Sequence, residues 1–325
     1  MKLLLAGLLA LLHPALAAQE GGRVEIVEVK GIIDASVERA IVATIEGAER
    51  ENASLVVLQI DSPGVVDGRR TERLSDAVRE ARVPIAAWIG PPGAEASNGA
   101  ALLVAAADFA AVSPLSSLGR VRTIDLRRRE PPPGGFTRPR LIRAATVAGL
   151  LEEIGNRIGV DPAAVAVRFH KLDLLGRVLH AAAQPSITYL LLLLALVGMV
   201  FELFHPSTGP AGVAGLAALA LSLYGIVTLG GSWLGFSLVV AGVALFAVDL
   251  RFQSLGPLTF SGFAALVAGS LLLFRGPWLR VSPWVLAFGI TSMVLFLVGA
   301  MTRVLRDLRA VARGELEVRE AHPEP

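Results

Sequence analysis

Residues 187–204 read ITYLLLLLALVGMVFELF, and at this stretch the chemistry of the chain changes. Before it, apolar runs alternate with charged segments and Gly/Pro turns, as in a soluble α/β domain. After it, nearly every residue up to Thr302 is apolar. The stretches that are long enough, or nearly so, to cross a bilayer as helices are 187–204, 210–229, 233–249, 256–274 and 282–302. The sequence therefore predicts a soluble head followed by an all-α, multi-span membrane domain.

The composition of the 325-residue chain agrees with this division. Hydrophobic residues make up 54% and charged residues 18%, with a mean hydropathy of +0.62, which is too apolar for a wholly soluble protein. The net charge is only +2 and no basic run carries interleaved aromatic residues, so we expect no nucleic acid partner. Cysteine is absent, which excludes disulfides, a thiolate nucleophile and cysteine-bound metal. We expect neither a cofactor nor a metal site.

The N-terminus has the pattern of an export signal over residues 1–17. Lys2 supplies a positive charge, Leu3 to Leu12 form an apolar core, and Ala15-Leu16-Ala17 offers the small residues that signal peptidase reads. About ten apolar residues are too few for a stable membrane span, although an uncleaved anchor is the alternative. In either case we expect the head, residues 18–183, on the periplasmic side of a bacterial cell membrane.

The arginines indicate an orientation for the membrane domain, residues 184–303. An odd number of spans places the tail, residues 304–325, on the side opposite the head. Because the tail is rich in arginine, the positive-inside rule puts it in the cytoplasm. The linker Gly230-Gly231-Ser232 predicts a tight antiparallel hairpin of the second and third spans. Glu202 and Asp249 each fall at a predicted span end, so interfacial anchoring is favoured over an ion path, and transport is a minor alternative.

Within the head, apolar strands alternate with helical segments. The predicted strands are 24–29, 55–60, 85–89 and 109–113, and the predicted helices are 36–49, 69–82, 100–107 and 140–157. Such alternation is typical of βαβ units in a mostly parallel sheet. Residues 160–183 are expected to link the head to the membrane through one or two further helices. The arginine-rich segment 118–140 is interpreted as a solvated loop.

Ser97 is the first candidate for chemistry in the head. It follows a loop that leaves the third predicted strand, and it immediately precedes an apolar helix. Free backbone N–H groups and the helix dipole favour negative charge at such a position. Acyl transfer needs a nucleophile, a base and donors for the developing oxyanion, and a helix start supplies donors. A plain serine N-cap is the competing interpretation.

Several segments of the chain carry a resemblance to a known family. They are Ile60-Asp61-Ser62-Pro63-Gly64, Ala96-Ser97-Asn98-Gly99-Ala100, Ser113-Pro114, 187–192, Phe201-Glu202-Leu203-Phe204-His205-Pro206 and 209–215. Together they resemble the NfeD family, membrane-bound serine proteases of the ClpP class. The resemblance implies a ClpP/crotonase-like α/β head with a Ser–Lys dyad, in which Ser97 is the nucleophile. It also implies an oxyanion site formed by Gly64, Val65 and Asn98.

The same resemblance implies partners and one missing part. Proteins of the family are paired with stomatin-like (SPFH) membrane proteins, so we expect such a partner in addition to the lipid bilayer. The head is a candidate for homo-oligomerisation. The long form of the family ends in a small OB-like domain, and residues 304–325 are too few to hold one.

The chain departs from the family pattern at the base of the dyad. Lysine occurs only at Lys2, Lys30 and Lys171. The segment around 136–144, where the family has its lysine, offers Arg138, Arg140 and Arg143 instead. Arginine stays protonated in proteins and cannot act as a base. Lys171, His170 and His180 are interpreted as surface or interfacial groups rather than substitutes.

A second departure lies in the oxyanion loop, where Val65 replaces a glycine of the family and restricts the backbone angles. Two functions remain open. The first is a membrane-anchored serine endopeptidase with an extracytoplasmic head and an impaired site. The second is a non-enzymatic membrane scaffold that binds SPFH-type proteins through its spans. The observation that separates them is whether a lysine amine lies within hydrogen-bond reach of the Ser97 hydroxyl.

Overall fold

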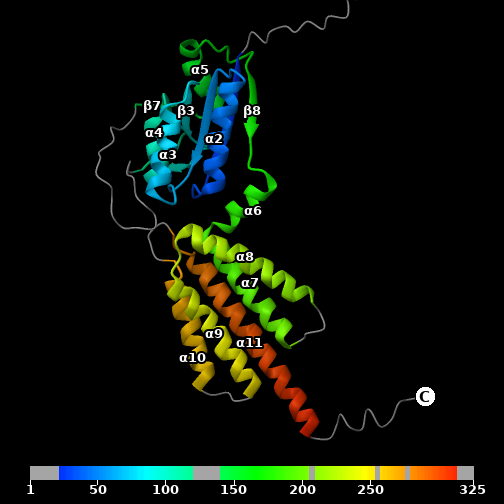
Figure 1. The fold of residues 1–325 in the computed structure, drawn as a ribbon. Coiled ribbons are helices and arrows are strands. Elements are labelled where there is room, and N and C mark those ends of the chain that lie inside the picture. Colours follow the sequence, from blue (N-terminus) through cyan, green and yellow to red (C-terminus); the bar gives the residue numbers. More distant parts are fainter. Residues whose placement is uncertain (1–21, 120–139, 205–208, 253–256, 275–278, 313–325) are drawn as a thin grey trace, which may run out of the picture.

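The computed structural model describes residues 22–119, 140–204, 209–252, 257–274 and 279–312. Figure 1 shows an α/β head at one end of the molecule and a bundle of long helices at the other, with helix α6 in the neck between them. The fold class predicted from the sequence, an α/β head followed by an all-α domain, is confirmed. The predicted export signal, residues 1–17, lies outside the described residues.

A six-stranded parallel sheet forms the centre of the head. In spatial order its strands are β7 (Leu141–Arg143), β5 (Phe109–Val112), β3 (Ile85–Ile89), β2 (Leu55–Asp61), β1 (Arg23–Lys30) and β8 (Ala166–His170). The inner strands β2 and β3 are almost wholly buried, because helices cover both faces of a parallel sheet. A separate short pair, β4 (Glu95–Ala96) and β6 (Ser117–Leu118), is also parallel.

The order of the strands explains which face each helix covers. From β1 to β2, β3 and β5 the chain moves in one direction across the sheet, so right-handed crossovers put the connecting helices on one face. These helices are α2 (Ala35–Arg50), α3 (Gly68–Arg79) and α4 (Asn98–Ala106). From β7 the chain returns across the sheet to β8 through α5 (Val147–Ile158), which packs on the opposite face with Trp88. The core of the head therefore has two apolar layers.

Two predictions for the head are wrong. The predicted helix 140–157 begins only at Val147, where Thr146 caps it by accepting the Gly149 N–H at 3.1 Å. The residues before it form β7, which is too short to show a periodicity of its own. The predicted linker 160–183 contains an edge strand, β8, before helix α6 (Leu174–Ala182). Because an edge strand has one exposed flank, the apolar and charged residues of β8 do not form a buried run.

The helical domain is built from two close helix pairs and one further helix. The helices are α7 (Pro185–Phe204), α8 (Pro210–Leu229), α9 (Trp233–Phe252), α10 (Pro257–Leu272) and α11 (Pro283–Ala312). Within each pair, glycines allow the two helix backbones to approach closely. A Cβ on Gly198 of α7 would lie 2.8 Å from the carbonyl oxygen of Ala211 in α8. A Cβ on Gly242 of α9 would lie 2.8 Å from the carbonyl oxygen of Gly262 in α10. The pairs are α7–α8 and α9–α10. The predicted hairpin of the second and third spans is wrong, because α8 and α9 turn at 230–232 but then diverge.

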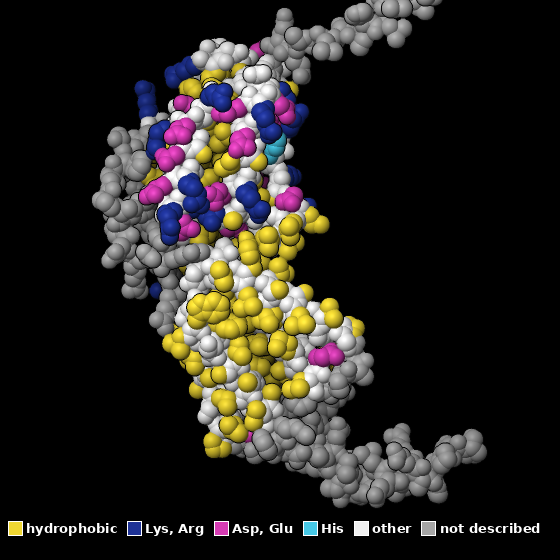
Figure 2. Space-filling model, viewed as in Figure 1, with side chains coloured by type: hydrophobic (Ala, Val, Ile, Leu, Met, Phe, Trp, Pro, Cys, Tyr) yellow, Lys and Arg dark blue, Asp and Glu magenta, His cyan; other side chains and the backbone are white. Residues whose placement is uncertain are grey.

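Helices lie at all five positions where spans were predicted. By length and composition, Pro185–Leu203 and Pro210–Leu229 are long and apolar enough to cross a membrane. The apolar parts of the other three helices are shorter: Trp233–Asp249, Pro257–Leu272 and Pro283–Gly299. On the face seen in Figure 2, hydrophobic side chains gather over this domain, as suits a surface that faces lipid. The number of crossings stays a prediction.

The carboxyl edge of the sheet faces the helical domain. Ile32, which follows β1, and Val66, which follows β2, are buried in the apolar cluster of the helical domain, together with Tyr189 of α7. Helix α6 completes the junction by contacting both α2 and α8. The loops that follow β1 and β2 therefore form the surface through which the head contacts the helical domain.

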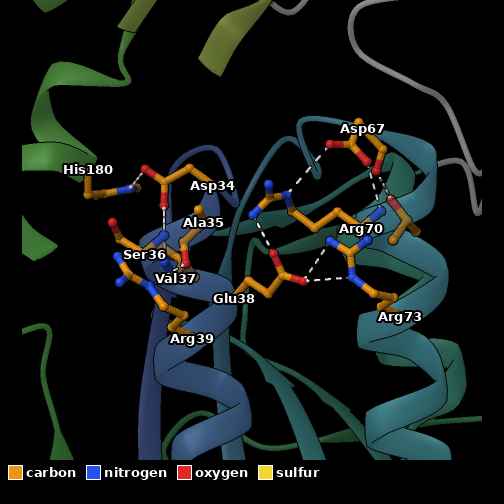
Figure 3. Close-up of polar contacts among 11 residues, drawn as sticks. Asp34, Ala35, Ser36, Val37, Glu38, Arg39, Asp67, Arg70, Arg73 and His180 are labelled. Atoms are coloured by element: carbon orange, nitrogen blue, oxygen red, sulfur yellow. Dashed lines mark hydrogen bonds and ion pairs between the residues drawn. The ribbon is translucent and has the colours of Figure 1, made fainter. Parts of the chain in front are cut away.

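Asp34 is the polar centre of this junction (Figure 3). Its Oδ1 accepts the N–H groups of Ser36 at 2.8 Å and Val37 at 3.0 Å and so caps α2, while its Oδ2 lies 3.2 Å from Nδ1 of His180 in α6. Burial by itself raises the pKa of the Asp34 carboxyl. The hydrogen bonds with His180 and the two N–H groups, together with the attraction to His180, outweigh it and leave the pKa below its usual 3.8. Beside this cap, Glu38 joins α2 to α3 through ion pairs with Arg70 and Arg73.

The cap on α2 generates the first prediction. Asp34→Ala should lower the free energy of unfolding by about 1–2 kcal/mol through the lost cap, and further through the lost contact with His180. Asp34→Asn should lose less, because asparagine also caps. Since the folded pKa is lowered, the contribution of the carboxylate is present above about pH 4 and disappears as the pH falls through the folded pKa.

The measurement is the apparent unfolding temperature of the full chain in detergent between pH 7 and pH 3. The matched control is Thr146→Ala, which removes the cap of α5 but no charge, so its effect should not change over this pH range. An Asp34→Ala protein as stable as the wild type at pH 7 would contradict the assignment of Asp34 as the cap.

Candidate active site

Ser97 stands at the junction of β4 and α4, near the carboxyl edge of the sheet. It is the N-cap residue of α4, with an extended backbone (φ −122°, ψ 161°), but its side chain makes no capping hydrogen bond. The hydroxyl donates instead to the Glu95 carboxylate. The Ser97 N–H donates to the carbonyl oxygen of Ser62 at 3.1 Å, which fixes the serine to the end of β2. The serine therefore occupies a helix start without using its hydroxyl as a cap.

Asn98 makes the turn that leads from this serine into the helix. Its φ is 51°, in the left-handed region that residues with a Cβ rarely adopt and that asparagine tolerates better than most. Its Nδ2 donates to the Pro63 carbonyl oxygen at 2.9 Å. The loop after β2 is thereby tied to the first residue of α4. This bond compensates for an uncommon backbone conformation and holds Ser97 at a sharp turn.

Gly64 and Val65 lie directly against that turn. Gly64 has a φ of 144°, and a Cβ there would lie 3.2 Å from the Asn98 Cβ and 3.5 Å from the Ser97 carbonyl oxygen. Val65 is completely buried, and its side chain is so close to Gly99 that a Cβ on that glycine would come within 2.7 Å of it. The valine is therefore accommodated by the absence of a side chain at position 99.

The N–H groups near Ser97 differ in what they can still bind. The Gly64 N–H already donates to the Ser62 hydroxyl at 3.1 Å. Within the part of the chain that the structure describes, the N–H groups of Val65 and Asn98 have no hydrogen-bond partner. Of the three residues expected at the oxyanion site, these two keep a free donor.

A backbone segment covers the serine. The Ser97 side chain belongs to a residue that is 3% exposed, and a Cβ on Gly119 would lie 2.0 Å from its Oγ. Gly119 is held there because its N–H donates to the Ala96 carbonyl oxygen at 2.8 Å. Only a glycine fits at this position. The segment that follows, residues 120–139 with Arg138, lies outside the described residues.

Neither described lysine is placed to activate Ser97. Lys171 follows β8, which is two strands away from β2, the strand to whose end Ser97 is bonded; this is a separation of roughly 10 Å at about 4.8 Å per strand. Lys30 ends β1 and is exposed. Among the described residues, no lysine amine forms a hydrogen bond with the Ser97 hydroxyl. Arg140 and Arg143 flank the far edge strand β7 and are also exposed.

Both histidines considered as substitutes have other partners. His170 Nε2 lies 2.6 Å from the Glu25 carboxylate, and His180 contacts Asp34 in the neck. Both rings are partly buried and bonded to these carboxylates, and the His180 ring lies at the junction with the helical domain. In the described part of the chain no group of three or more His, Cys, Asp or Glu side chains could hold a metal ion.

Glu95 is the residue of this site that the sequence analysis missed. It reaches Ser97 because residues two apart in a strand point to the same side. Its own N–H donates to Asp61 Oδ1 at 3.2 Å, and its carbonyl oxygen accepts the Ser62 N–H at 2.6 Å, so β4 is held firmly against the end of β2. The sequence feature that could have revealed Glu95 is the run Glu95-Ala96-Ser97 immediately before a helix. Chemically, the carboxylate orients the hydroxyl and can accept its proton.

Comparison with known proteins supports the resemblance noted in the sequence. Residues 186–302 match the family model of the NfeD integral membrane domain. The chain is 20% identical over 332 residues to the membrane-bound protease PH1510 of Pyrococcus horikoshii, with 85% of this chain and 74% of that protein covered. Residues 186–302 are therefore similar to the NfeD integral membrane domain, in agreement with the resemblance noted in the sequence.

Solved structures similar to the head come from the same relative. A 1510-N membrane protease specific for a stomatin homolog from Pyrococcus horikoshii aligns at 15% identity over 49% of this chain and 97% of that chain, with a TM-score of 0.39. A lysine-to-alanine mutant of the 1510-N membrane-bound stomatin-specific protease, in complex with a substrate peptide, aligns at 14% identity over 48% and 95%, with a TM-score of 0.41.

The contact between Gly64 and the serine turn generates the second prediction. Gly64→Ala should cost about 1–3 kcal/mol, because alanine at a φ of 144° is strained and its Cβ would press on Asn98. The matched control is Gly68→Ala at the start of α3, where an added Cβ meets nothing within 4 Å. That change should be neutral or slightly stabilising. Thermal unfolding of the two variants in detergent measures the difference, and equal effects would rule out the tight turn.

Proposed function

We propose that this chain, an NfeD-type membrane protein, is a membrane-anchored serine endopeptidase whose site at Ser97 is catalytically impaired. The observation that carries the proposal is the Ser97 hydroxyl itself. It makes no capping hydrogen bond and is bound to the Glu95 carboxylate, and among the described residues it contacts no lysine amine. The N–H groups of Val65 and Asn98, which have no hydrogen-bond partner within the described ranges, are the proposed oxyanion donors. The homology to a membrane-bound protease supports the reaction class.

In the proposed reaction the Ser97 Oγ attacks the carbonyl carbon of a peptide bond, and its proton passes to the Glu95 carboxylate. The resulting oxyanion accepts hydrogen bonds from the N–H groups of Val65 and Asn98. The C–N bond then breaks, and the leaving amine takes the proton from Glu95. Water attacks the acyl-serine ester with the same carboxylate as base, which releases the acid and restores the serine.

The proposed loss of catalytic rate follows from the use of a carboxylate as the general base. A carboxylate is a weaker proton acceptor than a neutral lysine amine, and loss of effective general-base help typically lowers a rate about 10²–10⁴-fold. Slow turnover is therefore the expected state of this site.

A second function, a non-enzymatic membrane scaffold, is favoured by one observation. Both described lysines, Lys30 and Lys171, lie away from Ser97. In that case the spans would bind a stomatin-like (SPFH) membrane protein and the head would serve assembly. The relatives found by comparison are named as proteases specific for a stomatin homolog, so a stomatin-like protein is the partner proposed for either function.

The third prediction concerns catalysis. The full chain in lipid nanodiscs should cleave a hydrophobic fluorogenic peptide slowly, Ser97→Ala should abolish cleavage, and Glu95→Gln should lower the rate at least about tenfold. A fluorophosphonate probe should label Ser97 slowly in the wild type and not in Ser97→Ala. Glu152→Gln on α5 is the control, because it removes an exposed carboxylate on the other face of the sheet.

Two results would change the proposal. Fast cleavage that survives Glu95→Gln would mean that another group is the base, and Lys171 would be the next residue to replace. Absence of both cleavage and labelling, with undiminished binding of a purified stomatin homologue, would favour the scaffold.

The fourth prediction concerns location and domain division. We propose residues 1–17 as an export signal, 18–183 as the head, 184–303 as the membrane domain and 304–325 as a cytoplasmic tail. Alkaline phosphatase, which is active only outside the cytoplasm, should be active when fused after Ala183 and inactive when fused after Pro325. An active tail fusion would mean an even number of crossings.

A further inference from the structure

Helix α6 presents a face that no described element covers. Leu174, Leu175 and Val178 are 71%, 63% and 41% exposed. The opposite side of the helix is occupied, since Gly176 is buried and His180 bonds to Asp34 of the head. The helix is therefore amphipathic, but its apolar side points away from the protein. Large apolar side chains exposed side by side indicate a surface with a partner.

The position of α6 indicates what that partner is. The helix ends at Ala182, and the first membrane helix α7 begins at Pro185, with Ile187 of its first turn also exposed. Figure 2 shows hydrophobic side chains continuing from the helical domain into the neck. An apolar helix face that joins the start of a membrane span lies at the level of the lipid headgroups. This is the setting of helices that lie flat in the membrane interface.

A cavity of about 310 Å³ opens beside this face, between α2 and the segment from β8 to α6. Its lining includes Ser36, Arg39, Lys171, Asp173 and Leu175. Ser36 is 3% exposed, and its Oγ has no hydrogen-bond partner within the described ranges. A buried hydroxyl without a partner, on the wall of a cavity, indicates a polar ligand.

The charges of the cavity select an anion. Arg39 and Lys171 contribute two positive charges, and Lys171 forms no ion pair among the described residues. Asp173 contributes one negative charge, and its Oδ1 is already used to accept the Gly176 N–H at 3.0 Å. His170 also lines the cavity, but its Nε2 is bound to Glu25. Arg39, Lys171 and Asp173 together carry a net charge of +1, which suits a phosphodiester with a single negative charge.

We propose that the neck binds a membrane phospholipid. Its phosphodiester occupies the cavity and receives hydrogen bonds from Arg39, Lys171 and the Ser36 hydroxyl. The start of its acyl chains covers Leu174 and Leu175, which explains in one step the exposed face and the unpaired hydroxyl. The site is separate from the peptidase site, because it lies beside the edge strand β8, two strands from β2, to whose end Ser97 is bonded.

The test uses the full chain and counts bound lipid by native mass spectrometry. The probes are dioleoyl phosphatidylglycerol, which is anionic, and dioleoyl phosphatidylcholine, which is zwitterionic. The wild type should retain the anionic lipid preferentially. Lys171→Gln and Arg39→Gln should each weaken retention about fivefold, the equivalent of roughly 1 kcal/mol per cation at a membrane surface.

The matched control is Arg50→Gln. Arg39 and Arg50 are both exposed on α2, and each donates from Nε to the carbonyl oxygen four residues earlier, but Arg50 lies at the far end of the helix. Its replacement should leave lipid retention unchanged. Equal losses for Arg39→Gln and Arg50→Gln would mean general surface charge and would overturn the site.

The depth of α6 is tested separately with a spin label. The chain has no cysteine, so Leu175→Cys carries a single label. In liposomes this label should be accessible to oxygen and protected from a water-soluble nickel complex, whereas a label at Glu152→Cys should show the reverse. A water-exposed Leu175 label would overturn the proposal.

Two competitors distinguish a bound lipid from a free anion or a protein partner. Displacement of the lipid by millimolar inorganic phosphate would make the cavity a site for free anions and would overturn the assignment to lipid. Protection of the Leu175 label only when a purified stomatin homologue is added would make the apolar face a protein interface, with the same consequence. Insensitivity to both competitors supports the lipid.

Discussion

The six strands of the sheet run in the same direction, so all of them end at one edge, and that edge is the one set against the helical domain. A parallel sheet has its loops of variable function at the carboxyl ends of its strands. In this chain those loops have two tasks. The loop after β2 places Gly64 against the serine turn and, two residues later, buries Val66 among the membrane helices. The geometry around Ser97 is consequently built on the contact between head and membrane domain.

The strands and helices that the sequence predicted well are those whose burial is a local property. β2 and β3 are continuous apolar runs, and α2 has a clear apolar stripe, so periodicity was sufficient for each. The errors concern elements whose existence depends on a distant partner. β7 has three residues and is a strand because β5 lies beside it, and β8 pairs with β1 across more than a hundred residues.

The candidate site divides in the same way. The position of Ser97 before an apolar helix could be read from the chain, because a helix start is encoded within a few residues. The contact between Ser97 and Glu95 depends on β4 being extended, and β4 is extended because it pairs with β6 and with the end of β2. Likewise, the fit of Val65 depends on Gly99 across the turn, a pairing that no local pattern contains. The left-handed backbone of Asn98 and the positive φ of Gly64 set the turn at Ser97. This turn does not depend on which residue serves as the general base.

The glycine contacts of the helical domain have a consequence for the order in which it is made. In α7–α8 and in α9–α10 the partners are consecutive in the chain, so each hairpin can close as soon as its second helix has been synthesised. Because α8 and α9 diverge, the first closed hairpin has little to hold it to the second. Helix α11, which follows both hairpins in the chain, contacts α7, α9 and α10. The membrane half is thus two units that can form locally, joined by a helix that is synthesised after both of them.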